Sequence, residues 1–300
     1  MSSKRALVMS VSAHFYGASA AVAAAFFWAV AAFLFRRAGA HVAPLTMNFV
    51  KGAVALICLV LLLGGDVMLL PDTVTFAALA LSGVIGIGLG DTLYFYALRH
   101  LGPRRTLVTT TLVPVAAAVG GWLWFGDVLT WVHVVAMALV LGGVVFVLWE
   151  KTAADYSGVH AVGIVLGVIY IGAETAGILL TKFAVTEWSG LHASWIRQMC
   201  ASVAIGVVLA ARRQPIVPTL PWTVWQPLLL ASVAGAFLGT WLSVEALKHT
   251  HTAVATTLSS ISPLFAIPLA MVWERERVAA GAIFATVVAT AGVAILFLSE

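Results

Sequence analysis

The sequence predicts an all-α integral membrane protein with ten transmembrane helices, arranged as two inverted five-helix repeats. Three observations lead to this fold class: the composition, the length of the apolar runs, and an internal repeat. Hydrophobic residues make up 62% of the 300 residues and charged residues 9%, whereas soluble proteins are about half apolar and a quarter charged. The composition therefore excludes a soluble enzyme or a soluble nucleic-acid-binding domain.

Ten apolar runs are long enough to cross a bilayer, since about 20 helical residues span the hydrocarbon core of about 30 Å. The predicted spans are 18–35, 44–63, 74–93, 106–125, 131–148, 162–182, 193–211, 224–244, 253–273 and 279–298. The loops between them are short. They leave no room for a soluble catalytic domain.

The second half of the chain repeats the first. Glycines, prolines and tryptophans recur 149 positions later: Gly86, Gly90, Pro114 and Trp124 return as Gly235, Gly239, Pro263 and Trp273. We assign residues 1–151 to the first repeat, 152–158 to a linker and 159–300 to the second repeat. Because each repeat has an odd number of spans, the second enters the membrane in the opposite sense, which is typical of transporters.

One acidic residue lies near the middle of a predicted span. A charge at a helix centre costs about 2.5–3.5 kcal/mol to insert, so Glu174 is a candidate for binding a cationic group or carrying a coupling proton. Lys51 and Arg197 lie about 10 Å from the nearer helix end, within reach of the interface. For these two, membrane anchoring and substrate binding are equally good interpretations.

Small residues and prolines recur inside the spans. The spacing of Gly86 with Gly90, and of Gly235 with Gly239, favours close helix packing over direct ligand contact. Pro114, Pro263 and Pro268 each leave a carbonyl without its helical partner. Nearby hydroxyls such as Thr110 and Ser259 either satisfy the kinked helices internally or line a central cavity.

Aromatic and polar residues mark the predicted third and eighth spans. Asp91, Tyr94, Tyr96, Trp241 and Glu245 could form a polar mouth to that cavity, although the commoner role of such rings is in the interfacial aromatic belt. Trp28 lies inside the first span. It is the counterpart of Glu174, because the early part of each repeat matches at an offset of 146 residues.

The net charge of +4 comes mostly from helix ends that face lipid headgroups, so we expect no nucleic-acid partner. Neither a nucleotide-binding motif nor a convincing metal-ligand spacing is visible in the sequence, and we expect no cofactor and no metal. A gradient or a partner must then drive any pumping. The expected partners are a small-molecule substrate, the lipid bilayer and protons as candidate coupling ions, with the chain acting as a monomer or homodimer.

These residues resemble the drug/metabolite transporter superfamily, specifically its EamA-type ten-helix exporters. The resemblance rests on Trp28, the basic residue Lys51, Tyr96-Ala97-Leu98, Pro114, Gly126-Asp127 and Gly142-Gly143, and on their repetition in Glu245-Ala246-Leu247, Ser262-Pro263 and Ala291-Gly292. It implies a cavity lined mainly by spans 1, 3, 4, 6, 8 and 9, and export of small metabolites such as amino acids.

The chain departs from this family at three places. Lys51 stands where arginine is usual, Asp127 replaces the usual glutamate, and Glu174 is not a family-wide feature, so the substrate does not carry over. Lysines and arginines are more numerous on the side opposite the termini, which by itself puts both termini outside. The family resemblance implies cytoplasmic termini, and we adopt that orientation.

We therefore predict a non-enzymatic secondary transporter in the plasma membrane, of the prokaryotic inner-membrane kind. It would work by alternating access around a midplane site near Glu174, Trp28, Thr110 and Ser259. Two alternatives are an intramembrane lipid-modifying enzyme, which would need convergent catalytic groups, and a non-transporting scaffold, which would show no stabilisation by a solute.

Overall fold

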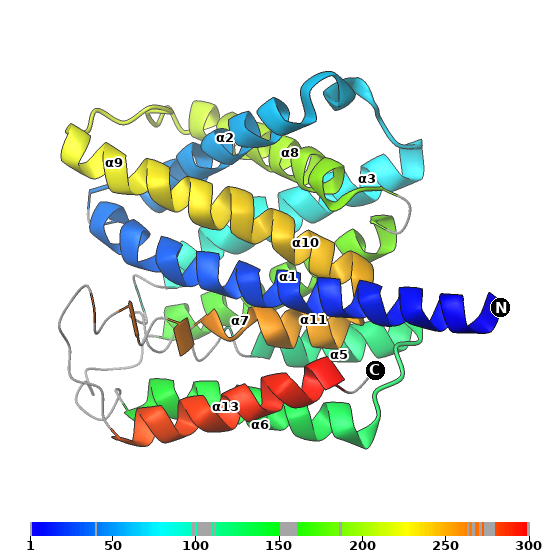
Figure 1. The fold of residues 1–300 in the computed structure, drawn as a ribbon. Coiled ribbons are helices and arrows are strands. Elements are labelled where there is room, and N and C mark those ends of the chain that lie inside the picture. Colours follow the sequence, from blue (N-terminus) through cyan, green and yellow to red (C-terminus); the bar gives the residue numbers. More distant parts are fainter. Residues whose placement is uncertain are drawn as a thin grey trace.

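The computed structural model describes residues 2–39, 41–97, 100, 110, 112–150, 161–185, 188–262, 264–265, 268–269, 272 and 280–298. Within these residues all regular structure is helical (Figure 1), which confirms the all-α prediction. The helices are α1 (Ser2–Gly39), α2 (Pro44–Leu63), η1 (Gly64–Met68), α3 (Thr73–Ser82), η2 (Gly83–Gly90), α5 (Leu112–Phe125), α6 (Trp131–Glu150), α7 (Ala161–Ala184), α8 (Gly190–Ala211), α9 (Trp222–Ala231), η4 (Ser232–Gly239), α10 (Thr240–His249), α11 (Thr252–Ser259) and α13 (Ala280–Leu298).

Six of the described helical stretches are long and apolar enough to cross a membrane: Ser12–Phe35, Pro44–Met68, Thr73–Ala97, Val162–Ala184, Gly190–Ala211 and Trp222–His249. Shorter apolar helices cover Leu112–Phe125, Trp131–Phe146 and Phe284–Leu296. Together with α11 these stretches are compatible with ten spans. Large apolar side chains such as Leu61 (76% exposed) and Val207 (64% exposed) cover the outside, as lipid contact requires.

Two of the observed helices, α1 and α11, differ from the predicted spans. α1 begins at Ser2, well before residue 18, because neither proline nor a polar loop interrupts the chain there. In the ninth span α11 ends at Ser259, four residues before the proline at 263. The predicted linker 152–158 lies outside the described residues.

Two segments of the bundle are π-helical, and they occupy equivalent positions in the two repeats. η2 begins at Gly83 and η4 at Ser232, 149 positions later. The amide of Asp91 donates to the Gly86 carbonyl, and the amide of Thr240 donates to the Gly235 carbonyl, each five residues back. Such segments are rare and frequently lie at functional sites.

Each π-helix is packed against the first helix of the other repeat. α7 crosses η2 where a Cβ on Gly86 would lie 3.2 Å from the Gly177 Cα, and α1 crosses η4 where a Cβ on Gly235 would lie 2.6 Å from Ala31 Cβ. Ala31 and Gly177 are equivalent positions, 146 residues apart. The two crossings are therefore copies of one contact.

Other helices pair with their own counterparts. α6 lies along α13 (Figure 1), and a Cβ on Gly143 would lie 2.8 Å from Ala289 Cβ, while one on Gly292 would lie 2.9 Å from Val140 Cγ2. These contacts are reciprocal, because both residue pairs are related by 149 positions. α2 packs on α8 in the same manner. The two repeats thus interlock about a pseudo-two-fold axis.

Candidate functional site

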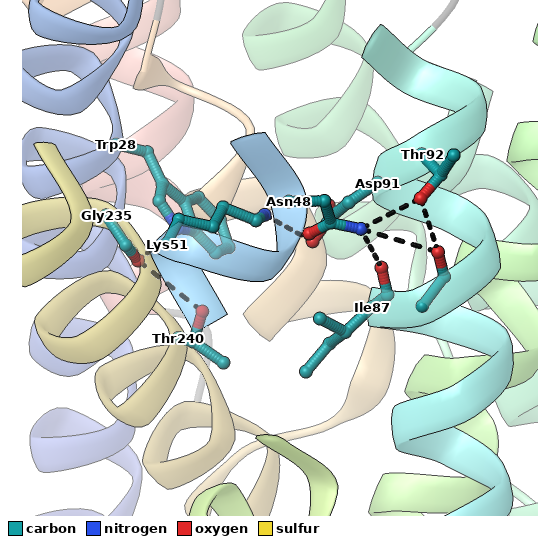
Figure 2. Close-up of polar contacts among 9 residues, drawn as sticks. Trp28, Asn48, Lys51, Ile87, Asp91, Thr92, Gly235 and Thr240 are labelled. Carbon is teal, nitrogen blue, oxygen red and sulfur yellow. Dashed lines mark hydrogen bonds and ion pairs between the residues drawn. The ribbon is translucent and has the colours of Figure 1, made fainter. Parts of the chain in front are cut away.

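The buried charge cluster begins on α2, where Lys51 forms an ion pair. Lys51 Nζ lies 2.5 Å from Asp91 Oδ2, in the helical turn that follows η2 (Figure 2). The ammonium also lies 5.3 Å from the centroid of the Phe95 ring. The Lys51 side chain is 10% exposed and that of Asp91 30% exposed, so the carboxylate retains surface for a further partner.

Asn48, one turn before Lys51 on α2, holds the two helices together. Its side-chain amide donates to the Ile87 carbonyl at 3.0 Å, to the Gly88 carbonyl at 3.4 Å and to Thr92 Oγ1 at 2.9 Å (Figure 2). The Thr92 hydroxyl in turn donates to Gly88 at 2.7 Å. Asn48 is fully buried, so these bonds fix Lys51 relative to η2.

Arg197 reaches η2 from α8. Its Nε donates to Ser82 Oγ at 3.0 Å, and a Cβ placed on Gly86 would lie 3.8 Å from its Nη2. The backbone of Arg197 touches Gly83, where any side chain would overlap with it. Arg197 is buried. Because the glycines of η2 have no side chains, its guanidinium group can lie directly against this helix.

Glu174 comes from α7 and lies against the end of η2. A Cβ placed on Gly90 would be 3.2 Å from Glu174 Oε2. The carboxyl group is within electrostatic range of Asp91, Arg197 and Lys51. Two cationic side chains, Lys51 and Arg197, and two carboxyl groups, Asp91 and Glu174, therefore share one region, which has no net charge when all four groups are ionised.

Two tyrosines adjoin the carboxylates. Tyr94 follows Asp91 by three residues and Tyr170 precedes Glu174 by four, so each ring shares a helix face with its acid. The ring centroids of Tyr94 and Tyr170 lie 5.7 Å apart with a tilt of 50°. Both side chains are half-buried. An aromatic surface thus accompanies the charged groups.

Trp28 occupies the corresponding place in the other repeat. Its Nε1 donates to the Gly235 carbonyl at 3.2 Å, which also accepts from Thr240 Oγ1 at 3.4 Å (Figure 2). The indole packs against Gly239, where a Cβ would lie 2.6 Å from Nε1. Trp28 is therefore hydrogen-bonded to η4, across the axis from Glu174 and η2.

Trp241 and Glu245 form a separate group on α10. Trp241 Nε1 donates to Glu245 Oε1 at 3.3 Å, and His249 Nε2 lies 3.5 Å from Glu245 Oε2. Because the repeats are inverted, this group lies toward the end of the bundle that holds the N-terminus. Tyr94 and the half-buried Tyr96 lie toward the other end, so the structure does not bring the four residues together.

The hydroxyl and proline positions lie on a different pair of helices. Pro114 is buried in α5, and Ser259 is the buried last residue of α11, which packs on α5. Thr110 is half-buried and Pro268 exposed, while Pro263 lies outside the described residues. Thr256 Oγ1 donates to the Thr252 carbonyl at 2.8 Å and Ser260 Oγ donates to the Thr256 carbonyl at 2.7 Å. These two hydroxyls satisfy carbonyls of their own helix.

A hydrogen-bonded contact joins the two repeats outside the membrane-spanning helices. Asp127, between α5 and α6, accepts from the Thr252 amide at 3.0 Å and lies 3.2 Å from His251 Nδ1. Burial opposes ionisation of Asp127, but the hydrogen bonds from His251 and Thr252 outweigh it and lower its pKa to about 2. The carboxylate therefore caps the N-terminus of α11, which belongs to the other repeat.

All four charged residues are separate candidates in the sequence, but the sequence does not predict the Lys51–Asp91 pairing. Sequence reasoning also missed Asn48, Ser82 and Tyr170. The spacing of Asn48 with Lys51 and of Tyr170 with Glu174, three and four residues, is a signal that could have placed these pairs on common helix faces.

Comparisons with known proteins agree with this architecture. The model of the EamA-like transporter family matches the chain twice, over residues 15–149 and 161–298. A search of curated proteins finds no match. Among solved structures, a crystal structure of a protein aligns over 94% of this chain and 96% of its own with a TM-score of 0.77 and 15% identity, a likeness that shows the fold.

Proposed function

We propose that this chain, which belongs to the EamA-like transporter family, exports amino acids or related zwitterionic metabolites. The family makes the chain a multi-pass membrane transporter of small metabolites. The substrate class, the direction and the mechanism are the proposal.

The observation that carries the proposal is the charge-balanced cluster around η2. Lys51 and Arg197 offer cationic donors for a substrate carboxylate, while Asp91 and Glu174 offer acceptors for an ammonium group. A solute with one charge of each sign is bound without leaving a net charge in the low-dielectric interior, where an unpaired charge is expensive. A purely cationic or anionic solute lacks this advantage.

The interlocked repeats support alternating access. The crossings of α1 with η4 and of α7 with η2 are copies of one contact, so a conformation in which their roles are exchanged is geometrically available. We propose that the two repeats rock about the axis with the charged cluster between them, in the plasma membrane and as a monomer or homodimer. A proton carried by Glu174 is the proposed coupling ion.

The contacts of the charged groups do not favour an intramembrane enzyme. Lys51 is paired with Asp91, and Arg197 with Ser82. These pairs orient ligand-binding groups, whereas catalysis needs a nucleophile aligned with a base and with donors for the developing charge. The proposed role of the cluster is therefore recognition.

Efflux from proteoliposomes tests the function. Vesicles containing the purified protein are loaded with labelled neutral amino acids, and efflux is measured against protein-free vesicles. We expect efflux of at least one amino acid, a severe loss in Lys51→Met and Arg197→Met, and a fall together with an altered pH profile in Glu174→Gln. Arg212→Gln, in the loop after α8, serves as the matched control and should retain efflux. Absence of efflux for every amino acid, with no stabilisation by them in a thermal screen, would refute the substrate class.

A further inference from the structure

Glu174 and Trp28 occupy equivalent positions and equivalent surroundings. They are 146 residues apart, in the first helix of each repeat. Trp28 packs against Gly239 of η4 and Glu174 against Gly90 of η2, two glycines related by 149 residues. One turn further along, Ala31 meets Gly235 and Gly177 meets Gly86. Glu174 therefore lies against η2 at the position where Trp28 lies against η4.

Trp28 is a hydrogen-bond donor to its π-helix. Its Nε1 donates to the Gly235 carbonyl at 3.2 Å. This carbonyl also accepts from the amide and the hydroxyl group of Thr240, so the indole proton shares it with them. The corresponding carbonyl on η2 is that of Gly86, which accepts from the amide of Asp91. Gly86 lies at the crossing with α7, where a Cβ on it would be 3.2 Å from the Gly177 Cα.

A carboxyl group can copy the indole only when it is protonated. An ionised carboxylate has four acceptor sites and no donor, whereas the neutral acid has one O–H donor. We propose that a proton bound by Glu174 is held between its carboxyl group and the Gly86 carbonyl of η2, so that the neutral acid ties α7 to η2 as Trp28 ties α1 to η4. This inference rests on the proposed transport function, because it assigns the coupling proton a place.

The same surroundings give the ionised form a different partner. Arg197 Nη2 also lies against Gly86, and Arg197 from α8, Lys51 from α2 and Asp91 beyond η2 are the charged groups that face Glu174. Tyr170 and Tyr94 complete the titratable groups around it. Of the other elements packed on α7, α3 and α5 contain no ionisable residue. α10 carries Glu245, Lys248 and His249 and meets α7 near its C-terminal end, where Lys182 Nζ donates to the Leu247 carbonyl. Loss of the proton therefore exchanges a bond between α7 and η2 for an ionic contact with α8.

The α1–η4 and α7–η2 crossings differ in their dependence on pH. The indole bond of Trp28 does not depend on pH, whereas the bond between α7 and η2 forms only while the proton is bound. The α7–η2 crossing is then the one that responds to the proton gradient. Gly86 and Gly177 leave no side chain between the two backbones there, which allows α7 to slide when the tie is released.

Thermal unfolding of the full-length protein in detergent between pH 5 and pH 9 tests the inference without requiring transport. We expect the wild-type Tm to fall by about 2–4 °C as the pH rises and the Glu174 proton is lost. Glu174→Gln keeps a donor of nearly the same shape and should hold the Tm near its low-pH value throughout. Glu174→Met, with no donor, should stay near the high-pH value throughout.

Two controls separate this contact from its neighbours. Trp28→Phe should lower the Tm at every pH and preserve the pH dependence. Asp91→Asn should keep a pH-dependent Tm with its midpoint moved, because it removes a charge that faces Glu174. The proposal is overturned if Glu174→Gln and Glu174→Met behave alike, or if the pH dependence survives in both.

A spectroscopic measurement decides the matter if a variant fails to fold. An infrared difference spectrum of the wild type between low and high pH should contain a protonated-carboxyl band that is shifted by hydrogen bonding. Selective labelling of the Gly86 carbonyl with ¹³C should perturb the companion amide band. A carboxyl band typical of a free acid, with no change on labelling, would also overturn the proposal. A protein that exports no amino acid but passes these tests would refute the proposed function and leave the proton site standing.

Discussion

Gly52 of α2 and Gln198 of α8 face each other, and they are each other's counterparts in the two repeats. A Cβ built on Gly52 would lie 2.6 Å from Gln198 Nε2, and the two residues are 146 positions apart. A residue that touches its own counterpart lies on the symmetry axis. The pseudo-two-fold axis of the bundle therefore passes through this contact, between Lys51 and Arg197, which are the neighbours of the two residues in sequence.

The crossing of α8 over η2 depends on Gly83. Any side chain there would overlap with the backbone carbonyl of Arg197, and backbone cannot move aside as a flexible side chain can. We expect Gly83→Ala to destabilise the protein by about 1–3 kcal/mol and to displace the guanidinium of Arg197. Gly88→Ala is the matched control, since the nearest atom to its Cβ would be at 3.7 Å. Equal unfolding temperatures for the two variants would contradict the close crossing.

The Lys51–Asp91 pair should show energetic coupling. Lys51→Met leaves the Asp91 carboxylate without its cation, and Asp91→Asn leaves the buried ammonium without its anion. We expect each single variant to lose stability and the double variant to lose less than their sum, with a coupling energy of about 1–3 kcal/mol. Denaturation of all four proteins under one condition measures it. Additive losses would show that the two groups do not interact.

The indole of Trp28 stabilises the contact of α1 with η4 by one hydrogen bond. Trp28→Phe keeps most of the ring packing and removes the donor to the Gly235 carbonyl, so we expect a loss of about 0.5–1.5 kcal/mol. Trp122→Phe, at a side chain that is 61% exposed, should change stability little. The comparison fails to support the bond if both substitutions have the same small effect.

Asp127 should give the protein a stability that depends on acidic pH. Its pKa is lowered to about 2 in the folded protein, whereas an unfolded chain titrates near 3.9. The carboxylate therefore contributes its full stabilisation above about pH 4, and this contribution is lost as the pH falls through about 2.

Variants of Asp127 test this contribution at neutral pH. We expect Asp127→Ala to cost about 1–3 kcal/mol, because the buried Thr252 amide loses its acceptor, and Asp127→Asn to cost less, because an amide oxygen still accepts. Asp66→Asn, an exposed carboxyl group in the α2–α3 connection, is the control. Thermal unfolding of the four proteins at pH 7, repeated at pH 3, provides the measurement. A wild-type advantage over Asp127→Ala that is unchanged down to pH 2 would contradict the assigned linkage.

The sequence by itself determined the class of the protein and its repeated architecture. Bilayer-length apolar runs permit little except helices, since backbone groups in lipid must be satisfied within the segment, and an offset of 149 residues between matching glycines reveals the duplication. The equivalence of Trp28 with Glu174 and of Lys51 with Arg197 also followed from the sequence, because both pairs are separated by the same offset of 146 residues. These features are local or periodic, so no knowledge of packing was needed.

The tertiary structure decided which of these residues meet. It paired Lys51 with Asp91, placed Asn48 and Arg197 on η2, and separated Trp241 and Glu245 from Tyr94, because the inversion of the second repeat carries equivalent residues to opposite ends of the bundle. It also revealed that two segments are π-helical, whereas the spacing of their glycines indicated only close helix packing. Pairing across helices depends on which faces cross and at what height, and these are set by the joint packing of all the helices, which no single span of sequence contains.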